Sequence, residues 1–144
     1  MQAARPGVQR RRTIARLLED ARSGLQRLDP GAAYEALRDG ALLVDTRCTE
    51  QRAAQGVIPD SWHVPLSVLF WRLDPASESC DPLLADTSRQ VILLCAHGYS
   101  SSLAAATLRQ LGFDGATDVE GGFEAWAAAG LPIDGPPADG GCIT

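Results

Sequence analysis

Short apolar runs alternate along the chain with amphipathic stretches. Residues 91–94 (Val-Ile-Leu-Leu) and 41–44 (Ala-Leu-Leu-Val) are continuous apolar runs, which are typical of buried strands. Shorter runs at 62–65 and 117–119 predict two more strands, and residues 25–28 predict a short edge strand. Spacing and composition predict helices over 13–23, 30–38, 50–55, 68–73, 102–111 and 123–129. This alternation predicts an α/β fold, an open parallel sheet with helices on both faces.

Residues that start and stop helices support these bounds. Thr13 suits an N-cap, and Asp29 followed by Pro30 provides both a cap and a first-turn proline. Gly24 and Gly112 stand where two of the helices are expected to end. The helical segments are therefore bounded by local signals at both ends.

The chain is long enough for one domain and too short for two ordinary ones, since it has 144 residues. We expect a disordered basic arm over 1–12, one folded domain over 13–133 and a flexible Gly- and Pro-rich tail over 134–144. The arm could bind an acidic partner or be a solvated tail, and we favour the solvated tail.

Composition and charge exclude several function classes. The net charge of −5 argues against general binding to nucleic acid or to an anionic membrane, and no apolar run is long enough to span a membrane. The 4 cysteines form no C-x-x-C pair, so zinc-ribbon and thioredoxin motifs are absent from the sequence. We expect no metal or other cofactor, and a reduced, cytoplasmic setting.

Cys95 is the main candidate for chemistry. It follows the apolar run 91–94 and precedes a short loop of small and polar residues and then a helix. Backbone N–H groups converge at such a place, where they lower the pKa of a thiol and bind anions. The sequence therefore predicts a thiolate enzyme with an anionic substrate or intermediate, in preference to a buried structural cysteine.

Four segments together resemble the single-domain rhodanese (thiosulfate sulfurtransferase) family. They are Val44-Asp45-Thr46-Arg47, Gly56-Val57-Ile58-Pro59, the strand-terminal Cys95 with its six-residue loop, and the segment from Gly121-Gly122 to Trp126. Each segment alone is weak evidence for the family, but the order and spacing of the four segments match the family's pattern from about residue 29 to residue 132. The resemblance implies a rhodanese fold with a five-stranded parallel sheet.

The resemblance also implies a function and a set of site residues. Cys95 would accept a sulfane sulfur from a small anionic donor, thiosulfate or a persulfide, and pass it to a thiol or cyanide, or to a protein acceptor. The active-site loop would comprise Ala96, His97, Gly98, Tyr99, Ser100 and Ser101. Asp45, Arg47, Gly121 and Gly122 would support that loop, and Trp126 would anchor the core.

Individual side chains leave alternatives open. His97 could donate a hydrogen bond to the donor or point into solvent, while Ser101 is expected to cap the following helix. Arg47 could steer anions, but we favour pairing with Asp45 or Glu50.

Two residues outside the loop are weaker candidates. Arg72 is a second candidate anion contact, although a surface arginine is the simpler interpretation. Cys142 could relay sulfur from Cys95, but we favour an incidental cysteine in the tail.

Two other functions compete with sulfur transfer. A cysteine phosphatase or arsenate reductase uses a similar thiolate loop, but it needs an arginine at the far end to bind the oxyanion in a bidentate manner. The sixth residue after Cys95 is Ser101, and the loop has neither arginine nor lysine. A non-catalytic interaction module on the same fold is the other alternative, and the presence of Cys95 argues against it.

Overall fold

A computed structural model describes residues 11–135 of the chain. The helices are α1 (Ile14–Ser23), α2 (Pro30–Arg38), α3 (Thr49–Gln55), α4 (Leu69–Leu73), α5 (Ser100–Gln110) and α6 (Gly122–Ala128). The strands are β1 (Leu42–Asp45), β2 (Trp62–His63), β3 (Val91–Leu94) and β4 (Thr117–Asp118). Each was predicted, with ends that differ by at most two residues. Most of the predicted arm and tail, including Cys142, lies outside the described residues.

The predicted N-caps are confirmed. The Thr13 hydroxyl oxygen accepts a hydrogen bond from the Arg16 N–H at 3.1 Å, and the Asp29 carboxylate accepts one from the Ala32 N–H at 2.8 Å. These bonds satisfy backbone donors that the first turn of a helix leaves free. They fix where α1 and α2 begin, and so the path of the chain toward β1.

The sheet is parallel throughout, with the strand order β2-β1-β3-β4. Asp45 at the end of β1 lies in register with Leu94 at the end of β3, and Leu93 with Asp118 at the end of β4. All strands therefore end at the same edge of the sheet. In parallel α/β sheets this edge is where ligands bind.

The expectation of a fifth strand is wrong for residues 11–135, in which the sheet has four strands. Residues 25–28 contribute only an isolated bridge, in which the Leu28 N–H donates to the Asp118 carbonyl at 3.1 Å and the Glu120 N–H donates to the Leu28 carbonyl at 2.8 Å. The pairing stops there because the next residue, Asp29, is already the N-cap of α2.

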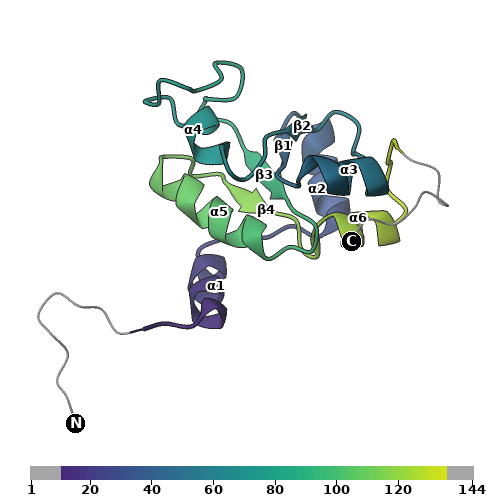
Figure 1. The fold of residues 1–144 in the computed structure, drawn as a ribbon, viewed down its shortest axis with the longest axis horizontal. Helices are drawn as coiled ribbons and strands as arrows, with labels where there is room; N and C mark the ends of the chain where they lie inside the picture. The colour runs from purple at the N-terminus through teal and green to yellow at the C-terminus, as the bar shows by residue number, and fades with distance from the viewer. Residues whose placement is uncertain (1–10, 136–144) are drawn as a thin grey trace, which may run out of the picture.

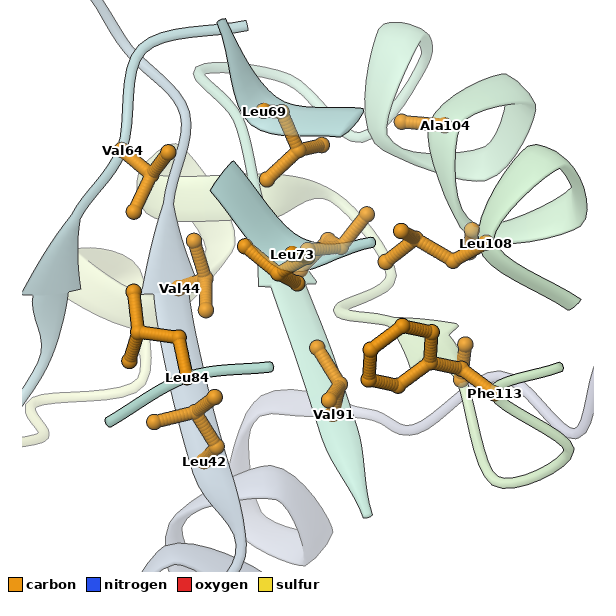
Figure 2. Close-up of a cluster of buried hydrophobic side chains, with 13 residues drawn as sticks. Leu42, Val44, Val64, Leu69, Leu73, Leu84, Val91, Ala104, Leu108 and Phe113 are labelled. Atoms are coloured by element: carbon orange, nitrogen blue, oxygen red, sulfur yellow. The ribbon is translucent and has the colours of Figure 1, made fainter. Parts of the chain in front are cut away.

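Helices cover both faces of the sheet, and each face has its own apolar core (Figure 1). Alternate residues of β3 point to opposite sides: Leu93 joins a cluster with Leu73 and Leu108 of α4 and α5, shown in Figure 2. Ile92 joins a second cluster with Trp126 of α6. Trp126 is fully buried and is the core anchor that was expected. The central strands are buried on both faces, as their continuous apolar runs predict.

Helix α1 lies below the sheet in Figure 1 and contacts α5. None of its residues is buried, and Ile14 is 67% exposed. Among residues 11–135, every helix is too short or too polar to cross a membrane.

Candidate active site

Cys95 directly follows β3 and is 6% exposed. The Gly98 N–H donates a hydrogen bond to its Sγ at 3.1 Å, and the Ser101 Oγ lies 3.2 Å from the same atom. Gly98 has a φ of 86°, a left-handed conformation that turns the loop back over the sulfur. The loop therefore curls around the thiol, as the sequence predicts.

The surroundings of Cys95 favour its ionised form. Burial raises the pKa of the Cys95 thiol, but the hydroxyls of Ser101 and Ser100 and the N–H groups of Ser101 and Gly98 more than offset it, so that the pKa lies below the ordinary 9.0. These donors stabilise negative charge on sulfur.

The remaining loop side chains lie at the rim. His97 is 58% exposed, and its Nδ1 lies 3.6 Å from the Glu124 carboxylate, so it faces outward. Tyr99 is also exposed, and it occupies the N-cap position of α5 without a side-chain cap.

The expectation that Ser101 caps this helix is wrong: Ser101 is buried within the first turn, and its hydroxyl points to Cys95 and Asp118.

The two glycines at the start of α6, Gly121 at its N-cap and Gly122 as its first residue, lie close to the loop. Gly122 has a φ of 63°, and a Cβ built on it would lie 2.4 Å from the Cys95 carbonyl oxygen and 2.7 Å from the Gly98 nitrogen. Gly121 has a φ of 74°, and a Cβ there would meet Ala125. Only backbone fits between the loop and α6, which explains why Gly121 and Gly122 are glycines.

The start of α6 also binds the loop through hydrogen bonds. The Phe123 N–H donates to the Cys95 carbonyl at 2.8 Å, and the Glu124 N–H donates to the Ala96 carbonyl at 3.1 Å. The first-turn N–H groups of α6 therefore hold the two loop carbonyls that follow β3.

Asp45 and Arg47 form a buried pair beside the loop. The Arg47 Nη2 donates to Asp45 at 2.9 Å and to the Gly56 carbonyl at 2.7 Å, and its guanidinium stacks over the Phe123 ring at 3.8 Å. The Arg52 Nε also donates to Asp45, at 3.0 Å. The expected pairing with Asp45 is confirmed. Because all its donors face inward, Arg47 serves to brace the neighbouring loops.

A second polar cluster lies behind the active-site loop. The buried Asp118 carboxylate accepts hydrogen bonds from Ser101, Ser102 and Arg27. Arg22 and Arg27 both donate to the Gly98 carbonyl, at 2.8 and 3.0 Å. This cluster joins the loop to α1, to β4 and to the segment between α1 and α2.

Comparison with known proteins places this geometry in a family. The model of the Rhodanese-like domain matches residues 29–129, more than half of the chain. The chain belongs to the rhodanese-like family. The strand-terminal cysteine, its curled loop and the double glycine all lie within the matched residues.

Curated relatives support a rhodanese-type sulfurtransferase. A protein named sulfurtransferase from Allochromatium vinosum is 35% identical over 98 residues, 68% of this chain and 82% of the relative. The thiosulfate sulfurtransferase GlpE of Pseudomonas savastanoi is 37% identical over 103 residues, 72% of this chain and 88% of the relative.

Two solved structures share the rhodanese fold with most of this chain. The polysulfide-sulfur transferase homodimer of Wolinella succinogenes has a TM-score of 0.68 and 26% identity, covering 87% of this chain and 88% of its own. A protein of unknown function from Rhodopseudomonas palustris, described as a possible tyrosine phosphatase, has a TM-score of 0.80 and 30% identity. The match covers 89% of this chain and 100% of that protein's chain.

Arg72 lies apart from the rhodanese loop. It is exposed on α4, and its Nη1 donates to the Ser79 carbonyl at 3.4 Å. The hollow that it lines, with Trp62, His63 and others, contains no residue of the Cys95 loop. Within residues 11–135, no cluster of three or more His, Cys, Asp or Glu side chains is arranged to hold a metal ion.

Three residues that contact the Cys95 loop were not predicted from the sequence: Arg22, Arg27 and Asp118. One signal was available, since Asp118 lies in the predicted short strand 117–119, whose carboxyl end must lie at the same edge of the sheet as Cys95. No comparable signal marks the two arginines, which reach the loop across 76 and 71 residues of sequence.

Proposed function

We propose that this chain is a sulfurtransferase that carries a sulfane sulfur on Cys95 as a persulfide. The observation that carries the proposal is the set of hydrogen-bond donors around Sγ, from Gly98, Ser100 and Ser101. They favour a thiolate, which is the nucleophile in sulfur exchange. Family membership and the activity of the named relatives support the same conclusion.

The proposed reaction has two displacements. The Cys95 thiolate attacks the outer sulfur of thiosulfate or of a persulfide donor; the donor's S–S bond breaks, and sulfite or a thiolate leaves with the bonding electrons. The enzyme is then a persulfide whose terminal sulfur is anionic. A thiol acceptor, as its thiolate, or cyanide next attacks that sulfur, and the Cys95 thiolate leaves.

The loop would serve both stages because thiolate and persulfide are both anions. The N–H groups and hydroxyls that face Sγ bind negative charge without any cationic side chain in the loop. His97, Tyr99 and Ser100 at the rim would meet the donor and the acceptor, since all three are exposed. We propose a cytoplasmic setting, where a thiol stays reduced.

The test is to weigh the intact protein after incubation with thiosulfate or with a small persulfide. We expect a gain of one sulfur atom, lost again on addition of cyanide or a thiol. Cys95→Ala should abolish the gain. Cys48→Ala is the matched control, because Cys48 is an exposed thiol beyond the end of β1 and should leave the gain unchanged. A gain that persists in Cys95→Ala would refute the proposal.

The phosphatase alternative is kept because one structural neighbour is described as a possible tyrosine phosphatase. That chemistry needs a guanidinium directed at the phosphoryl oxygens from inside the loop. Arg22 and Arg27 instead donate to the Gly98 carbonyl behind the loop. Hydrolysis of an aryl phosphate that is lost in Cys95→Ala, without sulfur uptake, would favour the phosphatase. If the protein neither takes up sulfur nor hydrolyses the aryl phosphate, the non-catalytic interaction module is favoured.

A further inference from the structure

The buried carboxylate of Asp118 lies behind the active-site loop, one hydroxyl away from the Cys95 sulfur. We propose that Asp118 and Arg27 are a positioning pair that controls, through the hydroxyl of Ser101, how readily Cys95 ionises. The inference deepens the proposed function, since it rests on Cys95 being the working thiol.

Asp118 is held by a complete set of donors. Its Oδ1 accepts from the Arg27 Nε at 2.9 Å, and its Oδ2 accepts from the Arg27 Nη2 at 3.2 Å. Oδ2 also accepts from the hydroxyls of Ser101 at 2.7 Å and Ser102 at 2.8 Å. The carboxylate is fully buried, and the Arg27 side chain is 16% exposed. A buried charge of this kind needs such partners.

The Ser101 hydroxyl has two acceptors within reach but only one hydrogen. Its oxygen lies 2.7 Å from the Asp118 Oδ2 and 3.2 Å from the Cys95 Sγ. With Cys95 as a thiol, the S–H donates to the Ser101 oxygen and Ser101 donates to Asp118. With Cys95 as a thiolate, the thiol proton has left to solvent, and the Ser101 hydrogen turns to the sulfur.

Asp118 can release that hydrogen because its other donors remain. Ser102 accepts a hydrogen bond from the Arg22 Nε at 3.1 Å, and its own hydrogen is directed to Asp118 at 2.8 Å, the shorter of two contacts, since the Gly98 carbonyl lies 3.4 Å away. Arg27 contributes two further bonds. The strength with which Asp118 holds the Ser101 hydrogen therefore depends on Arg27, and so does the stability of the thiolate.

Charge acts in the same direction as the hydrogen bonds. The Asp118 carboxylate disfavours a second negative charge on Cys95, and Arg27 compensates for it. Arg22 adds positive charge at the Gly98 carbonyl and lies over the Tyr99 ring. The other charged or titratable groups around the loop are Asp45 at the end of β1 with its partners Arg47 and, on α3, Arg52; His63 on β2; and the exposed His97 and Glu124.

The two members of the pair should shift the thiol in opposite directions. Asp118→Asn removes the negative charge and frees the Ser101 hydrogen, so the Cys95 pKa should fall by about one unit. Arg27→Gln leaves Asp118 without its compensating charge, so the Cys95 pKa should rise by about one unit. The double variant should return it close to the parent value.

The test measures the rate of alkylation by iodoacetamide against pH, in full-length protein whose Cys48, Cys80 and Cys142 are replaced by serine. Thiolate absorbance checks the same titration. Asp114→Asn and Arg89→Gln are the matched controls: both residues lie in loops that precede strands, at the sheet edge opposite Cys95. Salt screens charges at that distance, so neither control should move the profile.

Shifts of the same sign in Asp118→Asn and Arg27→Gln, or shifts no larger than those of the controls, would overturn the proposal. A purely structural pair would lower the melting temperature in both variants without opposite pKa shifts. If Asp118→Asn fails to fold, Ser101→Ala and Ser101→Thr carry the test: Ala should raise the Cys95 pKa, and Thr, which keeps the hydroxyl, should restore it. Alkylation needs no sulfur donor, so failed sulfur loading by the parent would count only against the proposed function.

Discussion

Arg47 shows how one buried side chain can set the position of several loops. It binds Asp45 through two nitrogens, reaches the Gln55 side chain and the Gly56 carbonyl, and packs on Phe123. Its side chain is fully buried. Removing one partner of such a pair costs more than the pair contributes, because the other charge stays buried.

We therefore expect Arg47→Met to lower the free energy of unfolding by about 3 kcal/mol. The loss is at the lower end for buried pairs because Arg52 still binds Asp45 at 3.0 Å. Urea unfolding followed by circular dichroism measures it. Arg38→Met is the control: Arg38 is exposed on α2, and its loss should cost less than about 1 kcal/mol. Equal losses in both variants would show that the Arg47 contacts contribute little.

At the scale of elements, the start of α6 and the Cys95 loop form one unit. Their backbones meet at Gly98 and Gly122, and two N–H groups of α6 bind loop carbonyls. The position of Cys95 is thus fixed by a helix that supplies no side chain to Sγ.

This contact predicts a large effect of one methyl group. Gly122→Ala places a Cβ 2.4 Å from the Cys95 carbonyl oxygen at a φ of 63°, so the loop or the helix must shift. We expect a loss of at least about 2 kcal/mol in stability, together with slower sulfur loading. Thermal unfolding and intact-mass kinetics check both.

Gly24→Ala is the comparison for this variant. Gly24 has a φ of −96° and nothing within 4 Å of a built Cβ, so stability should stay the same or rise by about 0.5 kcal/mol. If Gly122→Ala behaved like Gly24→Ala, the close fit between loop and helix would be without consequence.

The elements were predictable because their signals are local. The apolar run of β3 and the caps Thr13 and Asp29 lie within a few residues of the structure that they determine. The missing fifth strand was not predictable in this way, because pairing at Leu28 depends on how far Asp118 and Glu120 extend beside it.

The site residues, too, could be predicted where their signal is local and could not be predicted where it depends on tertiary contacts. Cys95, its loop and the glycines could be located from sequence because they lie on one strand–loop–helix unit or in a recognisable segment. The role of Ser101 was wrong because its hydroxyl is directed by Asp118, which lies 17 residues away. Arg22 and Arg27 act through tertiary contacts alone, and nothing in their own sequence surroundings indicates that role.

At the scale of the whole molecule, the sheet separates two apolar cores. Leu73 and Leu108 belong to the core under α4 and α5, where Figure 2 shows them pointing toward each other. Ile58 belongs to the core on the other face. A substitution in one core therefore has no neighbouring side chains in common with a substitution in the other core, whereas two substitutions in the same core do have common neighbours.

We expect Leu73→Ala and Ile58→Ala each to cost about 2–5 kcal/mol in the free energy of unfolding. Their costs should add within about 0.5 kcal/mol in the double variant, since they lie on opposite faces. Leu73→Ala with Leu108→Ala should deviate from additivity by more than that, because both enlarge the same cavity. Denaturant titration of the parent, of the single variants Leu73→Ala, Ile58→Ala and Leu108→Ala, and of the two double variants measures both couplings. Equal coupling in the two pairs would contradict the separation of the cores.

The two outer strands of the sheet, β2 and β4, have only two residues each. An outer strand of this length offers few free N–H and C=O groups to an incoming chain, and Pro65 follows β2 within two residues. Beyond β4, the single Leu28 bridge occupies the backbone groups that another molecule would need. The fold therefore offers little free strand edge with which another chain could extend the sheet.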